Sequence, residues 1–115
     1  MFVRLSRYEI PADRVDDAVS SFRDALEQIT DLGGFQEGYL LVNPESDCAA
    51  TITFWDSFAA LESSSVSASR LRTEAARAAD GGVTSSQDFE VAFQTGPKQA
   101  VTSASGTRLP EVGCA

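Results

Sequence analysis

The sequence of 115 residues contains no histidine, and this absence limits the chemistry that its side chains can perform. Catalysis by Ser-His-Asp or Cys-His groups is therefore excluded, as are zinc, non-haem iron and haem held by histidine. Any chemistry must use carboxylates, arginines, lysine, serines, two tyrosines and one tryptophan, or the reactivity of the substrate itself. We predict no metal site and no cofactor.

Five side chains are candidates for contacts with a small molecule. Arg4 and Arg7 lie three residues apart, so they point to opposite faces of a strand. The arginine that faces inward is positioned to stabilise an anion such as a phenolate, or else it is paired in a salt bridge. Tyr8 and Tyr39 can line a pocket, with core packing as the alternative. Trp55 can offer a flat wall to an aromatic substrate, or it seals the sheet against a helix.

The elements that must position these residues follow from apolar periodicity. Four strands are predicted, at residues 2–9, 35–42, 49–55 and 87–95. With one helix after the first strand and another after the third, the order is β-α-β-β-α-β. Right-handed crossovers then place both helices on one face of a four-stranded antiparallel sheet. We therefore predict one domain of the α+β, ferredoxin-like class.

The two helices have different sequence signals. Apolar residues recur every three or four positions after Asp13, which is the predicted N-cap, and the Gly33-Gly34 pair ends this helix. Asp56 or Ser57 is predicted to cap the second helix, which reaches residue 79. Its serine-rich run at 62–67 lowers helix propensity, so we expect an irregular or bent segment there. If the helix lifts off the sheet at residues 63–69, this polar segment forms the mouth of a pocket, and otherwise it is only a soft part of the helix.

The strand at 35–42 is apolar on both faces, with Tyr39 and Leu41 on one of them. An antiparallel sheet with one wet face should instead alternate apolar and polar residues. Something is therefore expected to cover the second face, and the simplest candidate is a second copy of the chain in a two-fold homodimer. The alternative cover is the tail at residues 96–115, which its composition predicts to be flexible or docked on the domain or its partner.

The formal net charge of −8 indicates which partners to exclude. An acidic surface repels phosphates, so nucleic acid and anionic membranes are not expected as partners. The N-terminus lacks the long apolar run of a signal peptide, and we expect a cytoplasmic protein. Cys48 and Cys114 are far apart in the sequence, and in that compartment we expect both to be free thiols.

Several motifs resemble the antibiotic biosynthesis monooxygenase (ABM) superfamily of dimeric α/β-barrel proteins. They are Gly33-Gly34-Phe35-x-x-Gly38-Tyr39, Phe54-Trp55-Asp56-Ser57 and Ala59-Ala60-Leu61. The resemblance covers residues 1–95, which we predict to form an ABM-like ferredoxin-fold domain. It implies a dimeric α/β barrel, with a pocket between the sheet and the helices of each protomer.

The resemblance also bears on individual positions. Trp55 matches a tryptophan of the better-known members, whereas Ser6 stands where they have an asparagine and Ser65 where they have a histidine. Residue types and resemblance together predict these substrate-binding residues: Ser6, Arg7, Tyr8, Tyr39, Trp55 and Ser65. No catalytic residue is assigned.

Two functions from different classes remain open. The resemblance implies a cofactor-independent monooxygenase that oxidises a polycyclic phenol to a quinone, with the substrate phenolate supplying the electrons. The alternative is a non-catalytic dimeric module that binds a small hydrophobic or aromatic metabolite, favoured by the lack of a strong acid–base constellation. Haem degradation by the family's usual route is not expected, because the histidine is missing.

Overall fold

The computed structural model of the protein describes residues 1–43 and 45–96. This part of the chain forms four strands, two α-helices and one short 3₁₀ turn. In order they are β1 (Phe2–Glu9), η1 (Ala12–Arg14), α1 (Val15–Ile29), β2 (Phe35–Asn43), β3 (Cys48–Trp55), α2 (Phe58–Ala78) and β4 (Gly82–Glu90). The predicted order of strands and helices is confirmed.

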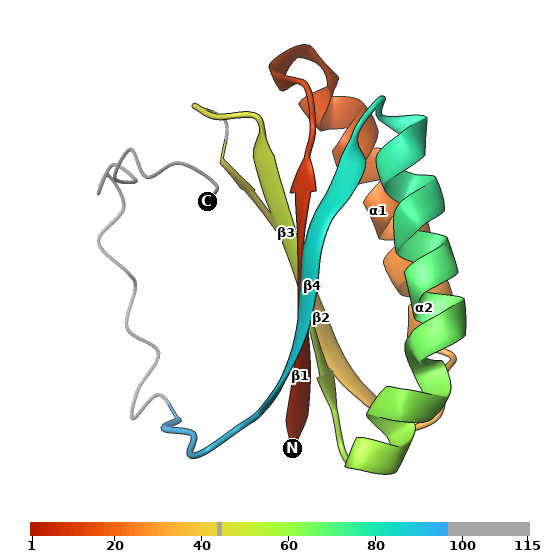
Figure 1. The fold of residues 1–115 in the computed structure, drawn as a ribbon, viewed down its shortest axis with the longest axis vertical. Helices are drawn as coiled ribbons and strands as arrows, with labels where there is room; N and C mark the ends of the chain where they lie inside the picture. The colour runs from red at the N-terminus through yellow and green to blue at the C-terminus, as the bar shows by residue number, and fades with distance from the viewer. Residues whose placement is uncertain (44, 97–115) are drawn as a thin grey trace.

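The four strands form one antiparallel sheet in the order β2-β3-β1-β4. Both helices cover the same face of the sheet, and they also pack against each other (Figure 1). This is the predicted α+β, ferredoxin-like arrangement. The first strand of the chain lies in the interior of the sheet, next to the last strand, so residues at the two ends of the domain become neighbours.

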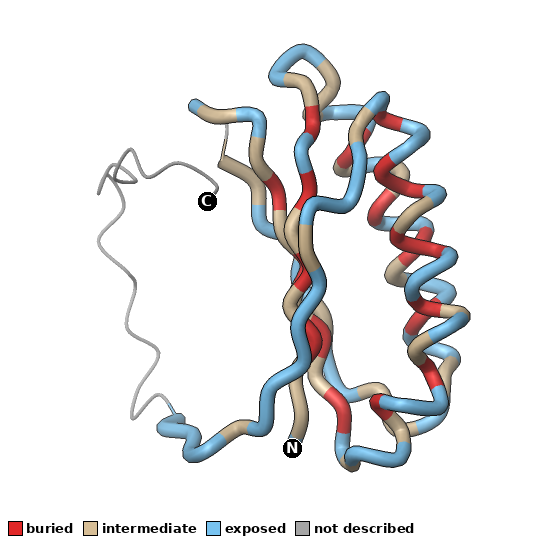
Figure 2. The backbone as a smooth tube through the Cα atoms, in the orientation of Figure 1, coloured by how far each residue is buried: buried red, intermediate tan, exposed pale blue. Residues whose placement is uncertain are grey.

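The core lies between the helices and the inward face of the sheet (Figure 2). Successive side chains of a strand point to opposite faces, and in β1 the buried positions are Arg4, Ser6 and Tyr8. Phe22 from α1 and Trp55 from β3 are fully buried in the same layer. The inward face of β1 therefore carries an arginine and a serine where an ordinary core would carry apolar residues.

The helix starts are partly as predicted. Ser57 caps α2, because its side-chain oxygen accepts a hydrogen bond from the backbone N–H of Ala60 at 3.1 Å. The prediction that Asp13 caps the first helix is wrong. Asp13 lies within η1, and α1 begins at Val15 with no side-chain hydrogen bond at its cap. The 3₁₀ turn after Pro11 uses the residues that would have formed the first helical turn.

The serine-rich segment of α2 does not interrupt the helix, which is continuous from Phe58 to Ala78. Ser63 and Ser64 each donate a hydrogen bond from the hydroxyl to the backbone carbonyl three residues earlier. These local bonds satisfy the hydroxyls without unwinding the helix. The prediction of an irregular segment that interrupts this helix is therefore wrong.

The last strand lies earlier in the chain than predicted, at Gly82–Glu90 and not at 87–95. The prediction followed the apolar residues Phe89, Val91 and Phe93, but β4 is an edge strand that is mostly exposed. Hydrogen bonding to β1 sets its limits, with Gly82 opposite Glu9 and Glu90 opposite Phe2. A polar edge strand has no apolar alternation for sequence reasoning to detect.

Two expectations concern the cysteines and the tail. Cys48 is disulfide-bonded, which corrects the expectation of a free thiol at this position. Disulfides are typical of oxidising compartments, so this bond does not favour the cytoplasmic placement, which stays a prediction. The tail predicted for residues 96–115 lies outside the described residues except for Gly96.

The outer face of the sheet, opposite the helices, carries large apolar side chains. Tyr39, Leu41 and Phe89 are each close to half exposed there, at 48%, 47% and 48%. Val3 and Ile52 lie on the same face by the strand register. No helix in residues 1–43 and 45–96 is both long and apolar enough to cross a membrane.

Candidate functional site: a pocket with two buried arginines

A pocket of about 640 Å³ lies between α2 and the β1–β4 side of the sheet. Three elements line it, namely β1 and the distant consecutive elements α2 and β4. The lining residues used below are Arg4 from β1, Ser65, Ser69, Arg70 and Arg72 from α2, and Ser86 and Asp88 from β4. Its volume is within the usual range of pockets that hold small molecules.

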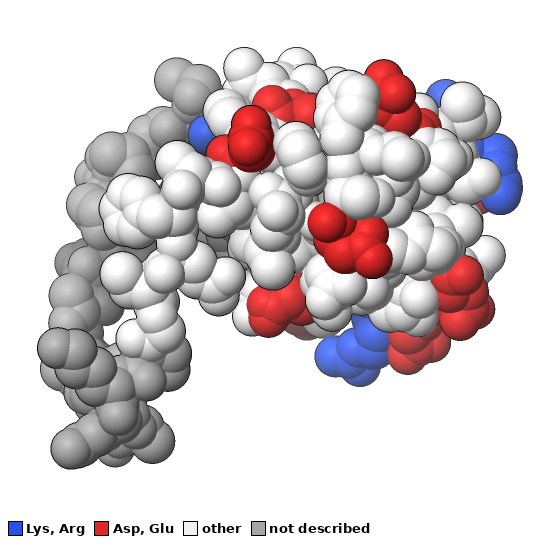
Figure 3. All heavy atoms as spheres, turned by 90° about the horizontal axis from the view of Figure 1, so that it is seen from below, with Lys and Arg blue, Asp and Glu red and all other residues white. Residues whose placement is uncertain are grey.

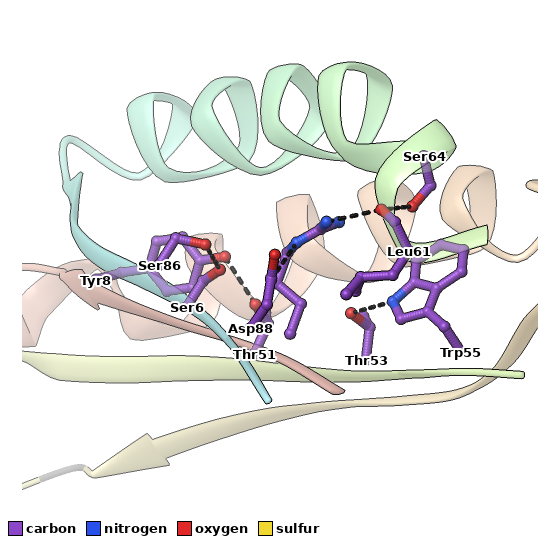
Figure 4. Close-up of polar contacts among 10 residues, drawn as sticks. Ser6, Tyr8, Thr51, Thr53, Trp55, Leu61, Ser64, Ser86 and Asp88 are labelled. Carbon is purple, nitrogen blue, oxygen red and sulfur yellow. Dashed lines mark hydrogen bonds and ion pairs between the residues drawn. The ribbon is translucent and has the colours of Figure 1, made fainter. Parts of the chain in front are cut away.

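Arg4 reaches the pocket because it lies on the inward face of the interior strand β1. Its Nε donates to Asp88 Oδ1 at 3.0 Å, and its Nη2 donates to the backbone carbonyl of Leu61 at 2.8 Å. Dashed lines in Figure 4 mark these two bonds at the labelled residues Asp88 and Leu61. Arg4 is 4% exposed, and its Nη1 is buried with no hydrogen-bond partner. The guanidinium is thus fixed at two donor positions and unpaired at a third.

Arg72 enters the same pocket from α2 and is also 4% exposed. Within the described residues it makes no hydrogen bond, and its buried Nη1 has no partner. Burial lowers the pKa of Arg72, and the positive charge of Arg4 lowers it further, while Tyr8 and Asp88 act in the opposite direction. Arg72 therefore lies close to a like charge in a poorly solvated place, which is costly unless another group compensates it.

The charged groups of the pocket leave one positive charge without compensation. Arg4 is paired with Asp88, and Arg70, which is 62% exposed, lies 3.6 Å from the carboxylate of Glu74 on the same helix. The charge of Arg72 remains. This is an unusual local balance in a chain of net charge −8. Figure 3 shows acidic side chains spread over the face in view, with fewer basic ones among them.

Beside the pocket, the inward face of the sheet carries polar side chains that form two hydrogen-bonded pairs. Ser6 and Ser86 share a hydrogen bond between their hydroxyls at 2.9 Å, and Tyr8 and Thr51 share one at 2.7 Å (Figure 4). The Tyr8 ring also packs on Phe22, with centroids 4.6 Å apart. Burial raises the pKa of Tyr8, and the hydrogen bond with Thr51 and the charge of Arg72 oppose this rise.

Trp55 lies in the core beyond this polar patch. Its side chain is fully buried, its Nε1 donates to Thr53 Oγ1 at 3.0 Å, and its ring meets Phe35 edge-on at 5.5 Å. The indole N–H thus already has a partner inside the protein. Trp55 is not among the residues that line the pocket.

The predicted substrate-binding residues are placed in three regions. Ser65 lines the pocket, and Ser6 contacts it through Ser86. Tyr8 and Trp55 lie in the core. Arg7 and Tyr39 lie on the outer face of the sheet, where the Tyr39 hydroxyl donates to the Glu37 carboxylate at 3.0 Å. The structure therefore brings only Ser6 and Ser65 to this pocket.

The predicted substrate-binding residues do not include Arg72, Ser86 or Asp88, and from the sequence Arg72 is interpreted as surface charge that could at most gate the pocket. A signal existed for Arg72, because it falls four residues after the buried Ala68 and so lies on the buried stripe of α2. No such signal existed for Ser86 and Asp88, because their register against β1 became clear only once the limits of β4 were known. Arg4, weighed as a candidate beside Arg7, is the arginine that faces inward.

Within the described residues, no group of three or more histidine, cysteine, aspartate or glutamate side chains could hold a metal ion. The hydrogen-bond donors that the pocket offers are guanidinium and hydroxyl groups, which can bind an anion. The arrangement can bind an oxyanion, orient a small ring system against α2 and exclude some water.

No family model matches the sequence. Two proteins of Mycobacterium tuberculosis are similar to it, the uncharacterized proteins MT2634 and Rv2557, each 33% identical over 92 residues. The match covers 79% of this chain but only 41% of each relative. The chain thus spans less than half the length of the curated relatives it matches.

Solved structures similar to this one agree in fold. SnoaB of Streptomyces nogalater, a cofactor-independent oxygenase, has a TM-score of 0.63 at 17% identity, covering 84% of this chain and 97% of that one. The haem degrader MhuD of Mycobacterium tuberculosis has a TM-score of 0.62 at 20% identity, with 84% and 100% coverage. A Deinococcus radiodurans protein described as an antibiotic biosynthesis monooxygenase reaches 0.68 at 8% identity, with 86% and 100% coverage. At these identities the likeness concerns the fold.

Proposed function

We propose that this chain, which has the fold of the antibiotic biosynthesis monooxygenase superfamily, is an oxygenase that works on an electron-rich polycyclic phenol without a bound metal or flavin. The observation that carries the proposal is the pocket beneath α2, with the two buried arginines Arg4 and Arg72 in its wall. Support from the fold comes from SnoaB, a cofactor-independent oxygenase. The missing histidine favours this chemistry over haem degradation.

The proposed reaction needs only the substrate and O₂. The phenolate gives one electron to O₂, and the resulting phenoxyl radical and superoxide combine at a ring carbon that carries hydrogen. The O–O bond of the peroxide then breaks. The outer oxygen and the hydrogen of that ring carbon leave as water, and the ring carbon becomes the second carbonyl. One phenol and one O₂ thus give one quinone and one water. The protein contributes shape, removal of water and stabilisation of the anion.

Oxygen uptake by protein treated with a chelator, with anthrone and naphthol as substrates, tests the proposal. We expect one O₂ consumed for each quinone formed. Ser65→Phe should block the pocket and abolish uptake, whereas Ser63→Phe, at an exposed position outside the pocket, should keep it. Equal uptake by the two variants would place the reaction elsewhere, and no uptake by the unmodified protein would refute the proposal.

A second candidate function is a non-catalytic module that binds a small hydrophobic or aromatic metabolite. It is favoured by one specific feature: among the described residues of the pocket wall, the carboxylate is Asp88, and this carboxylate is already engaged in an ion pair with Arg4. This candidate predicts stoichiometric binding that Ser65→Phe abolishes, without oxygen uptake. The two functions therefore differ in turnover and not in the place of binding.

The proposed assembly is a two-fold homodimer with the outer faces of two sheets in contact. Its support is the apolar outer face, where Tyr39, Leu41 and Phe89 are about half exposed. Half-exposed aromatic and aliphatic side chains on one flat face are typical of an interface. The helix-side pocket lies on the opposite face, so each protomer would keep its own pocket open.

A further inference from the structure

The two buried guanidinium groups indicate the charge state of the ligand. Arg4 and Arg72 come from different layers of the domain, line one pocket, and each has a buried Nη1 without a partner. Buried donors in proteins are almost always paired, with protein groups, with ordered water or with a ligand. Two guanidinium donors that are unpaired among the described residues, in the wall of one pocket, therefore call for an acceptor that this part of the chain does not supply.

The acceptor must also balance charge. The charged residues that line the pocket are Arg4, Arg70, Arg72 and Asp88. Asp88 balances Arg4, and Glu74 lies beside the exposed Arg70, so one positive charge remains, at Arg72. A ligand with one negative charge makes the pocket neutral. Water could satisfy the donors but would leave this charge uncompensated.

We infer that the pocket binds its ligand as a mono-anionic oxyanion between Arg4 and Arg72, and that it keeps an ionisable phenol in the deprotonated form. The inference rests on the proposed function for the identity of the ligand as a phenol. Arg4 is held in place by Asp88 and Leu61, so it presents a fixed donor. Arg72 has no hydrogen bond to any described residue, so rotation of its side chain can bring its donors to the oxyanion.

Deprotonation is the step that makes the phenol reactive toward O₂. A phenolate gives up an electron more readily than the neutral phenol, and guanidinium groups stabilise it in the bound state. The pocket would thus prepare the substrate without needing a general base, since the proton is released to solvent on binding. This accounts for a site that has two arginines and no free carboxylate among its described lining residues.

The experiment is an anaerobic titration of naphthol against pH, in which absorbance reports the phenolate. We expect bound naphthol to ionise at least one pH unit lower than free naphthol, which corresponds to a tenfold or greater preference for the anion. Arg72→Met should abolish the shift. The matched control is Arg77→Met on the same helix, which changes an exposed arginine outside the pocket and should leave the shift unchanged.

Two further probes identify the chemistry of the ligand. Methoxynaphthalene, which cannot ionise, should bind at least tenfold more weakly than naphthol. If it binds equally well, or if Arg72→Met keeps the pH shift, the inference is overturned. Binding of neither naphthol nor naphthoate overturns it too. If naphthoate binds in a manner that depends on Arg72 and naphthol does not, the oxyanion site stands and its ligand is a carboxylate, which refutes the phenol as substrate.

The outcome for the proposed function is read separately, in the presence of oxygen. Anion binding that depends on Arg72 without oxygen uptake would support this inference and refute the oxygenase. Oxygen uptake that survives Arg72→Met would support the oxygenase and refute this inference. The fold of each variant is checked by circular dichroism, so that loss of binding is not confused with loss of structure.

Discussion

Arg4 of β1 and Leu61 of α2 are joined by a hydrogen bond of 2.8 Å from the arginine Nη2 to the leucine carbonyl oxygen. The guanidinium that faces the pocket thus also holds the second helix on the sheet. Arg72, in the same pocket, makes no hydrogen bond within the described residues. Two arginines of equal burial are therefore expected to have opposite effects on stability.

Arg4→Met should destabilise the domain by about 1–3 kcal/mol, because the Leu61 carbonyl and Asp88 lose a charged hydrogen-bond donor. The measurement is urea unfolding followed by circular dichroism, with the slope of the transition compared between the proteins. An unchanged midpoint would mean that this arginine does not anchor the helix.

Arg72→Met should leave the free energy of unfolding of the ligand-free domain unchanged or raise it, by up to about 1–4 kcal/mol. The variant removes a buried charge that lies near Arg4 and has no hydrogen-bond partner, and it keeps most of the side-chain volume. The same urea series measures it. If it destabilises the domain as much as Arg4→Met does, the charge of Arg72 is already compensated in the free protein.

Gly34 is expected to tolerate no side chain. Its φ of +84° is in the left-handed region, and an added Cβ would lie 2.7 Å from Asp56 Oδ1 and closer still to Ala60. Gly34→Ala should therefore lower the free energy of unfolding by at least about 1 kcal/mol. Gly33→Ala is the matched control, because nothing lies within 4 Å of its added Cβ. Equal melting temperatures for the two variants would contradict the prediction.

Stability should fall at alkaline pH because of Tyr8. Burial raises the pKa of Tyr8 above its usual value of 10.0. The unfolded chain therefore loses this proton first, and the stabilisation, complete below pH 10, is lost as pH rises through the folded pKa. Tyr8→Phe should lower stability at neutral pH by about 1 kcal/mol through loss of the Thr51 bond.

Thermal unfolding at several pH values above and below 10 measures this effect. The Tyr8→Phe variant should show a smaller alkaline loss than the unmodified protein. Tyr39→Phe is the control for a tyrosine on the outer face, and it should keep most of the loss. An equal alkaline loss in the Tyr8→Phe variant would assign the effect to other groups.

The homodimer is tested at the outer face. Leu41→Glu should convert the protein to a monomer, because a carboxylate would be buried against the partner sheet. Val66→Glu, on the exposed side of α2 where the side chain is 81% exposed, should leave the dimer intact. Light scattering at micromolar concentration measures both. A monomeric unmodified protein would refute the assembly.

The elements with strong local signals could be predicted from the sequence. Alternation in β1 and the Ser57 cap are written in neighbouring residues, and both were correct. The first helix cap and the last strand were not, for different reasons. Asp13 has the chemistry of a cap, but the chain forms a 3₁₀ turn there. The limits of β4 depend on pairing with a strand some 80 residues earlier in the chain, which periodicity does not record.

The pocket was only partly predictable for the same reason. The serine-rich segment indicated the mouth of a pocket, and Ser65 and Ser69 do line it, although the helix stays unbroken. The charge of the pocket depends on Arg4, Arg72 and Asp88, whose proximity is a property of the tertiary fold. Trp55 attracted attention because of its chemistry, yet its indole N–H is bonded to Thr53 within the core.

The neighbouring positions of the first and last strands have a consequence for synthesis on the ribosome. Arg4 is made before its ion-pair partner Asp88, which is separated from it by 84 positions. Until β4 emerges from the exit tunnel, β1 lacks its β4 neighbour and Arg4 lacks the Asp88 carboxylate. Completion of the binding site therefore waits for the synthesis of β4, and a chain truncated before β4 lacks that site.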